Sequence, residues 1–172
     1  TAHVIEQGCE LLGAAVGEVL TPAKVELPLD EATETWRNEL LAQVAPEGRK
    51  FALIAPSAGW GAKQWPAERY GAVAAALAKA GYVPLVNAVF AGDLLASSVV
   101  DASGGTAIVV PCSVGQLIAL TRHASLVVAG DTGPLHLAAA LERPVVALFG
   151  PTDPVRNGPY GTASRVLRHA SS

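Results

Sequence analysis

The sequence contains no methionine and only two cysteines, Cys9 and Cys112, among its 172 residues. The two cysteines lie far apart and form no Cys-x-x-Cys pair, which excludes a disulfide scaffold. We expect both thiols to be reduced and buried, as in a cytoplasmic protein. Because a primary translation product begins with methionine, a chain that begins at Thr1 is expected to be processed or excised from a longer protein.

Long apolar runs are also missing from the sequence. A membrane-spanning helix needs about 18 or more consecutive apolar residues. The most hydrophobic stretch is interrupted by four polar residues, Asp131, His136, Glu142 and Arg143. A signal peptide is not expected, because three acidic residues lie within what would be its apolar region, Glu6, Glu10 and Glu18. The sequence therefore predicts a cytoplasmic chain without a transmembrane segment.

Charged and aromatic residues are scarce, at 16% and 5% of the sequence. The 12 Lys and Arg residues are outnumbered by 15 Asp and Glu residues, which leaves a net charge of -3. Duplex nucleic acid normally requires a clustered basic face, so nucleic acid is not expected as a partner. A hydrophobic content of 51% excludes a disordered chain, and the length suits a single domain.

From Phe51 onward, short apolar runs alternate with segments that have helical periodicity. The expected strands cover residues 51–56, 82–88, 107–110, 126–129, 145–149 and 165–167. The expected helices cover residues 67–80, 93–100, 114–123 and 135–141. Strands that are apolar throughout are buried on both faces, so the pattern predicts an α/β fold with a Rossmann-like parallel sheet of five or six strands flanked by helices.

The first 50 residues are less regular. Residues 2–16 have the spacing of a helix, and residues 21–29 contain two prolines and are expected to form a connector. Asp30 stands where a helix N-cap is expected, and apolar residues follow it at intervals of four. A second helix is therefore expected before the first strand.

The strongest functional pattern follows the fourth expected strand, because ligands of open parallel sheets bind outside the carboxyl ends of the strands. There the chain reads Gly-Asp-Thr-Gly-Pro, with Pro134 suited to the first turn of a helix. The free N–H groups of a helix N-terminus carry about half a positive charge and suit a diphosphate. Thr132 and Gly133 are the expected donors, and His136 lies one turn further on. A structural explanation is equally open: Asp131 or Thr132 caps the helix and His136 faces solvent.

A second candidate loop follows the first expected strand. Gly59 and Gly61 permit unusual backbone angles, and Lys63 offers a compact charge for a phosphate. The loop matches neither the P-loop nor the Gly-x-Gly-x-x-Gly fingerprint. The alternative is that Lys63 is a solvated surface charge.

Three further segments lie at the same edge of the predicted sheet. Asp93 can accept hydrogen bonds from a ribose, or it can cap the following helix. The turn at residues 110–113 can hold a nucleotide base, or Ser113 can cap the next helix. The loop at residues 149–161 projects polar groups toward the ligand side, or it is only a structural turn.

Several chemistries have no motif in the sequence. It contains no Gly-x-Ser-x-Gly elbow, no His-Glu-x-x-His pair and no cluster of Cys and His residues. We therefore expect no metal site and no cofactor.

Taken together, three segments resemble the glycosyltransferase family 9 heptosyltransferases, in order and in spacing. They are PSAGWGAKQWPAERY at residues 56–70, GDTGPLHLAAALERPVVALFGPTDP at 130–154, and GPYG at 158–161. The resemblance implies a two-domain GT-B enzyme, of which residues 51–172 are the nucleotide-sugar (donor) binding domain. Residues 1–50 are then the interdomain helix and linker, and the N-terminal acceptor domain, which carries the catalytic base, is expected to be absent from the chain.

The resemblance also implies an activity and its residues. Such an enzyme is an inverting glycosyltransferase that transfers heptose from ADP-heptose to the inner core of lipopolysaccharide, in the cytoplasm at the inner face of the bacterial inner membrane. The residues implied to be catalytic are Lys63, Asp131 and His136. The residues implied to bind the donor are Gly59, Lys63, Asp93, Thr132, Gly133 and His136. The chain alone is expected to be inactive.

Two other functions stay open from the sequence. One is a nucleotide-binding or regulatory Rossmann-like module without transferase activity, although the missing Gly-x-Gly-x-x-Gly fingerprint argues against it. The other is a related GT-B enzyme that acts on sugar nucleotides, such as an epimerase, which would prefer UDP to ADP.

Overall fold

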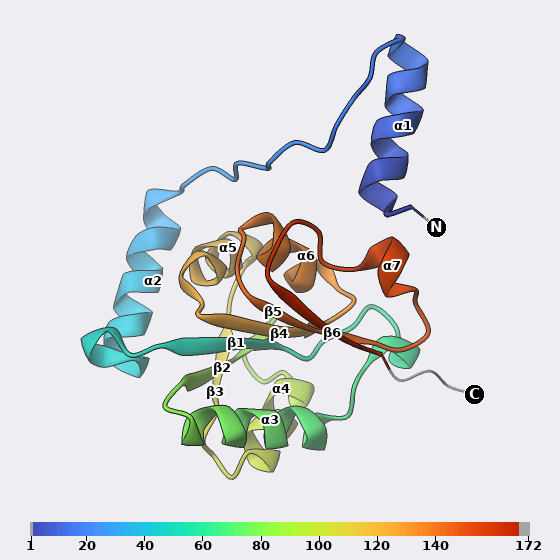
Figure 1. Cartoon of the computed structure of the whole chain (residues 1–172). Coiled ribbons are helices and arrows are strands. Elements are labelled where there is room, and N and C mark those ends of the chain that lie inside the picture. The colour runs from blue at the N-terminus through green and yellow to red at the C-terminus, as the bar shows by residue number, and fades with distance from the viewer. Residues whose placement is uncertain (1, 169–172) are drawn as a thin grey trace.

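Six strands form one parallel sheet in the order β3-β2-β1-β4-β5-β6 (Figure 1). The structure is a computed structural model that describes residues 2–168. The strands are β1 (Phe51–Ala55), β2 (Val83–Ala88), β3 (Ile108–Pro111), β4 (Leu126–Gly130), β5 (Val145–Phe149) and β6 (Ser164–Arg168). The predicted Rossmann-like parallel sheet is confirmed, and the order of the strands reverses between β1 and β4.

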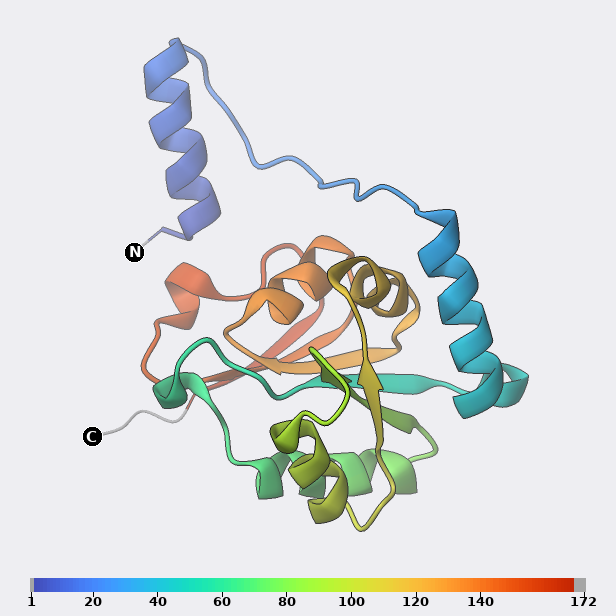
Figure 2. The ribbon, with the colours of Figure 1, turned by 180° about the vertical axis from the view of Figure 1, so that it is seen from behind.

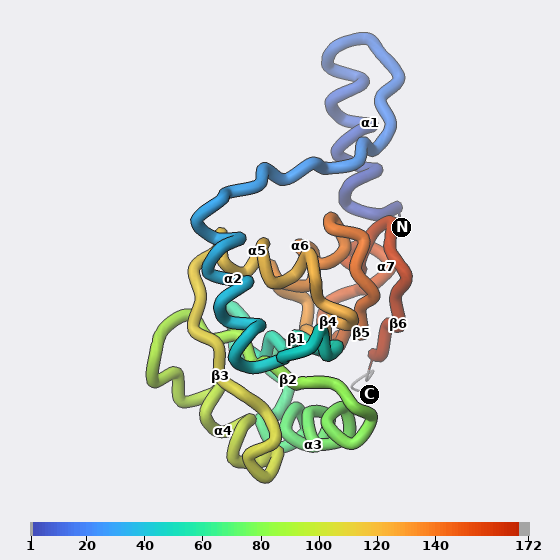
Figure 3. Tube along the Cα trace, turned by 90° about the vertical axis from the view of Figure 1, so that its left-hand side faces the viewer, coloured from blue at the N-terminus to red at the C-terminus, as the bar shows by residue number. Residues whose placement is uncertain are grey.

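Helices cover both faces of the sheet (Figure 3). One face carries α3 (Ala67–Lys79) and α4 (Leu94–Ala102), and the other carries α2 (Glu31–Val44), α5 (Val114–His123) and α6 (Gly133–Ala140). Two hydrophobic cores result, one on each side of the central strands. All five residues of β1 are buried, as expected for a strand covered on both faces, whereas all five residues of the edge strand β6 are exposed.

Side-chain caps explain where several helices begin. The Asp30 carboxylate accepts a hydrogen bond of 3.0 Å from the Thr33 N–H at the start of α2. Ser113 and Gln116 form a capping box at the start of α5, with reciprocal hydrogen bonds of 3.3 and 2.8 Å. Both N-caps were predicted from the sequence.

Two local differences from the prediction have simple causes. Helix α6 begins at Gly133, two residues before the predicted range, because the Thr132 carbonyl already accepts from the N–H groups of Leu135 and His136. The short helix α7 (Pro154–Asn157) lies in what was expected to be a turn. Its signal was present in the sequence, since Asp153 is the N-cap and a proline occupies the first helical position.

The segment before β1 divides into two parts. Helix α2 packs against the sheet core through partly buried apolar side chains, including Trp36 and Leu40. The hydrophobic core therefore includes residues that precede residue 50 in the sequence. Helix α1 (Val4–Val16) stands apart from it, at the other end of an extended connector (Figure 2). The N-terminal end of α1 contacts the domain near residues 158–160: His3 Nε2 lies 2.9 Å from the Gly158 carbonyl oxygen, and the Tyr160 hydroxyl donates to the Glu6 carboxylate at 3.4 Å. The division of function between residues 1–50 and 51–172 stays a prediction, and residues 1 and 169–172 lie outside the described part.

Within residues 2–168, no helix has both the length and the apolar character needed to cross a membrane.

The buried Tyr70 hydroxyl and the Cys112 thiol predict a loss of stability at high pH. Contrary to the expectation from the sequence, Cys9 and Cys112 are only partly buried. Burial raises the pKa of Tyr70 from 10.0 to about 12 and the pKa of Cys112 from 9.0 to about 11. Both groups ionise more readily in the unfolded chain. The stability that they contribute is therefore fully present below their pKa values in the unfolded chain. It is lost as the pH rises through their pKa values in the folded protein. We expect the free energy of unfolding, measured with urea, to fall between pH 9 and about 12. A Tyr70→Phe, Cys112→Ala variant should lose less stability over that range, and equal losses in both proteins would contradict the assignment.

Candidate functional site

Two loops meet where the strand order reverses. The first follows β1 and contains the short 3₁₀ helix η2 (Gly61–Lys63). The second follows β4 and leads directly into α6. Because β1 and β4 are paired neighbours, the ends of both loops lie side by side at the carboxyl edge of the sheet, which is where α/β folds bind their ligands.

Lys63 and Asp131 form an ion pair across these two loops. Lys63 Nζ lies 2.6 Å from Asp131 Oδ2, and the two side chains are only 19% and 8% exposed. Lys63 is therefore not the solvated surface charge that the sequence left open. A charge-assisted hydrogen bond this short and this shielded fixes both groups relative to the sheet.

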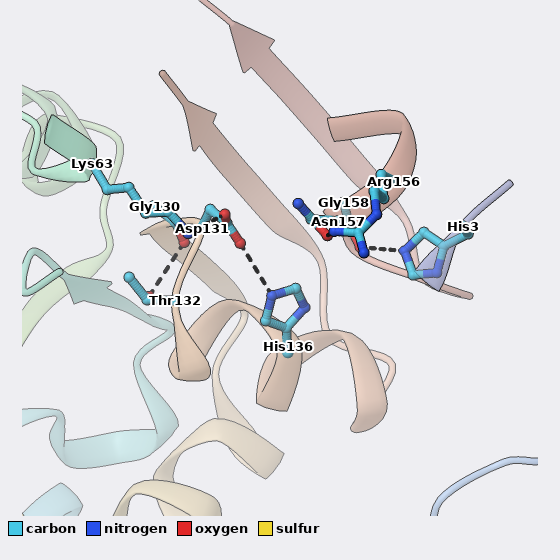
Figure 4. Close-up of polar contacts among 9 residues, drawn as sticks. All are labelled: His3, Lys63, Gly130, Asp131, Thr132, His136, Arg156, Asn157 and Gly158. Carbon is cyan, nitrogen blue, oxygen red and sulfur yellow. Dashed lines mark hydrogen bonds and ion pairs between the residues drawn. The ribbon is translucent and has the colours of Figure 1, made fainter. Parts of the chain in front are cut away.

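His136 joins the same pair from the first turn of α6. Its Nε2 lies 3.3 Å from Asp131 Oδ1, as Figure 4 shows, and its side chain is 47% exposed. Asp131 thus lies between two nitrogen groups, one on each oxygen. The three residues that the family resemblance implies to be catalytic form one connected cluster.

The surroundings of Asp131 favour its charged form. Burial raises the pKa of the Asp131 carboxyl, but hydrogen bonds from Lys63 and His136, together with the charge of Lys63, lower it below its ordinary value of 3.8. The Thr152 hydroxyl in the loop after β5 also lowers this pKa, although its buried Oγ1 makes no hydrogen bond of standard geometry among the described residues. Asp131 is accordingly a carboxylate at neutral pH.

The N-terminus of α6 lies next to this cluster with free donors. Thr132 is the N-cap by position, but its side chain makes no capping hydrogen bond; its hydroxyl instead donates to the Gly130 carbonyl at 3.3 Å. Within residues 2–168, the N–H groups of Thr132 and Gly133 donate no hydrogen bond. A Cβ built on Gly133 meets nothing within 4 Å, so packing does not require a glycine there. Free N–H groups beside a lysine are typical of sites that bind anions.

The other predicted residues lie in different places. Gly59 precedes η2, and a Cβ built on it meets nothing within 4 Å. Asp93 is the N-cap of α4, where its Oδ1 accepts from the N–H groups of Leu95 and Ala96 at 2.9 and 3.1 Å. The capping role is therefore present, while ribose binding by Asp93 and a direct ligand contact by Gly59 stay predictions.

A cavity of about 330 Å³ adjoins the α6 N-terminus. Its wall combines residues at or just after the ends of β1, β2 and β3 with the first turn of α6, among them Ser57, Asn87, Cys112, Val114 and Pro134. The turn that was expected to hold a base contributes Cys112 and Ser113 to it, so the capping role of Ser113 and a place beside the cavity coexist. The sequence analysis gave Asn87 no individual role, although a polar residue near the end of an otherwise apolar strand was a visible signal.

Among the residues that the structure describes, no group of three or more His, Cys, Asp or Glu side chains is placed to hold a metal ion.

The fold is a Rossmann-like domain, and the cluster of Lys63, Asp131 and His136 lies at the point where the strand order reverses. The family model of "Glycosyltransferase family 9 (heptosyltransferase)" matches residues 1–172, and the chain belongs to that family. The resemblance inferred from the three sequence segments is thereby confirmed.

Curated relatives of the chain are lipopolysaccharide heptosyltransferases. The chain is 32% identical to lipopolysaccharide heptosyltransferase 3 of Escherichia coli over 148 residues, which is 78% of this chain and 43% of the relative. It is 29% identical to lipopolysaccharide heptosyltransferase 1 of Pseudomonas aeruginosa over 160 residues, or 92% of this chain and 43% of the relative. The chain therefore spans less than half the length of these relatives.

Solved structures agree with the fold. The ADP-heptose lipopolysaccharide heptosyltransferase II of E. coli matches with a TM-score of 0.70 at 27% identity, covering 87% of this chain and 46% of that one. The E. coli heptosyltransferase WaaC, solved with ADP, matches with a TM-score of 0.65 at 26% identity, and the match covers 92% of this chain and 48% of WaaC. A family 9 glycosyltransferase from Veillonella parvula matches with a TM-score of 0.83 at 24% identity, and the match covers 98% of this chain and 49% of that one. This likeness supports the fold alone.

Proposed function

We propose that this chain is the donor-binding part of an inverting heptosyltransferase that uses ADP-heptose and acts on a lipopolysaccharide precursor. The observation that carries the proposal is the cluster of Lys63, Asp131 and His136 beside the free N–H groups of α6. Relatives solved with ADP and with ADP-2-deoxy-2-fluoro heptose support the choice of donor.

In the proposed binding mode, the diphosphate of the donor lies at the α6 N-terminus. The N–H groups of Thr132 and Gly133 donate hydrogen bonds to the diphosphate oxygens. The Lys63 ammonium group and the His136 ring N–H add two further donors. The adenine base of the donor lies in the cavity beside Pro134, which adjoins the N-terminus of α6. The site thus separates a polar place for the phosphates from a largely apolar place for the base.

The chemistry proposed is a single displacement at the anomeric carbon. The acceptor hydroxyl oxygen forms a bond to that carbon, and the bond from the carbon to the diphosphate oxygen breaks, with its electron pair leaving on the diphosphate. Lys63, His136 and the α6 N-terminus stabilise the negative charge that develops on the departing oxygen. These groups take the role that a divalent metal ion plays elsewhere, so we propose a reaction without metal. The hydroxyl proton passes to a carboxylate that the family resemblance assigns to the acceptor-binding half.

Calorimetric titration of the chain with nucleotides tests the proposal. We expect ADP to bind and to be preferred to UDP, NAD and FMN. A preference for UDP would favour a different sugar-nucleotide enzyme, and a preference for NAD or FMN would favour a nucleotide-binding module. Because the catalytic base is assigned to the acceptor-binding half of the enzyme, we expect ADP-heptose and a lipopolysaccharide acceptor to give no product with this chain alone. Heptosyl transfer by the chain would contradict that assignment.

A further inference from the structure

Trp60 is an exposed aromatic residue on the loop that carries Lys63. Its side chain is 54% exposed, although burial of a large aromatic ring is strongly favourable. Its backbone is fixed relative to the lysine, because the Trp60 carbonyl accepts a hydrogen bond of 3.1 Å from the Lys63 N–H at the start of η2. The ring centre lies 5.8 Å from Lys63 Nζ, within the range of a cation–π contact.

Other aromatic rings of the neighbouring segments already have partners. Trp65 packs edge-on against buried Tyr70, with the ring centres 5.0 Å apart. Tyr160 lies 4.7 Å from the ring of His3, and its hydroxyl donates to Glu6 at 3.4 Å. Trp60 has no aromatic partner within residues 2–168. Its indole therefore leaves ring surface open beside the lysine.

We propose that Trp60 is a stacking platform for a pyranose ring at the boundary of the donor site. The inference rests on the proposed function, in which Lys63 holds the diphosphate. The glycosyl group of a nucleotide sugar is joined to that diphosphate through a single oxygen, so its ring begins within a few ångströms of Lys63 Nζ. The face of an indole is electron-rich and attracts the C–H hydrogens of a sugar ring, while the sugar hydroxyls at the ring edge stay free for hydrogen bonds.

Titration calorimetry with ADP and with ADP-heptose tests the inference in the 172-residue chain. The readout is the ratio of the ADP-heptose affinity to the ADP affinity, which cancels contacts to the base and the phosphates. We expect Trp60→Ala to lower this ratio by about 2- to 10-fold, the range of an aromatic stacking contact. Trp60→Phe, which keeps an aromatic face, should restore most of it. Phe90→Ala is the matched control, because Phe90 is 61% exposed on the loop after β2, and it should leave the ratio unchanged.

A third titration, with a soluble lipopolysaccharide core oligosaccharide, identifies the source of the sugar. If Trp60→Ala weakens oligosaccharide binding and leaves the ratio unchanged, the platform serves the acceptor sugar. If the variant changes neither the oligosaccharide affinity nor the ratio, the inference is overturned while the proposed function stands. The same holds if the variant lowers the affinities for ADP and ADP-heptose equally and leaves the oligosaccharide affinity unchanged. If the wild-type chain binds neither ADP nor ADP-heptose, the proposed function fails and the inference fails with it.

Discussion

Replacing Lys63 by alanine is expected to weaken ADP binding by about 10- to 100-fold, which is the loss of one hydrogen bond to a charged group. The substitution removes a cation from the proposed diphosphate site. It also leaves the Asp131 side chain, which is 8% exposed, without the amine that lies 2.6 Å away. An uncompensated carboxylate beside a diphosphate repels it, so both effects act in the same direction. Calorimetric titration with ADP measures the change.

Controls separate this effect from a general loss of charge. Lys79→Ala removes the same charge from an exposed position in the last turn of α3, and it should leave the ADP affinity unchanged. The pKa of Asp131, followed by carbon NMR, should rise in Lys63→Ala because the hydrogen bond and the positive charge that lower it are gone. An ADP affinity that is unchanged in both Lys63→Ala and Asp131→Ala would contradict the site.

Replacing Gly71 by alanine is expected to destabilise the protein by about 1–3 kcal/mol, the usual cost of overpacking a core. Gly71 is buried in α3, where it faces the end of α4. A Cβ at this position would lie 2.5 Å from Ala102 Cβ, 2.7 Å from the Ala102 carbonyl carbon and 2.9 Å from the Ser103 nitrogen. Two of these atoms belong to the backbone, so α3 and α4 must move apart. Urea denaturation measures the change in the free energy of unfolding.

Gly8→Ala is the matched control for this substitution. Gly8 also lies inside a helix, α1, but a Cβ there meets nothing within 4 Å. Without a clash, alanine is favoured over glycine in a helix by about 1 kcal/mol, so Gly8→Ala should leave the protein as stable as before or slightly more stable. If Gly71→Ala were also neutral or stabilising, the close packing of α3 on α4 would be wrong.

Much of the fold followed from local patterns. Helix α5 and strand β5 have the predicted bounds, because a capping serine and a run of apolar residues each act within a few neighbouring positions. The position of α2 behind Asp30 was predicted for the same reason. Helix α7 was missed only because its Asp-Pro start lies in a loop rich in proline and glycine.

The site was predicted less completely. Spacing alone left Lys63 and His136 open between a ligand role and a surface role, and it was the family resemblance that linked them to Asp131. The structure adds residues from other segments, including Thr152 near the Asp131 carboxylate and Asn87 of β2 in the adjoining cavity. It also places α2 with the sheet, which its composition did not reveal.

The sequence by itself determined the class of fold, the succession of strands and helices, and the presence of a helix directly after β4. These features depend on periodicity and capping, which are local properties of the chain. Only the tertiary structure decided that Lys63 and Asp131, 68 residues apart, lie 2.6 Å from each other. That contact exists because β4 pairs with β1 and not with β3, the strand that precedes it in the sequence. Strand pairing depends on how distant segments pack together, and no local pattern in the sequence specifies it.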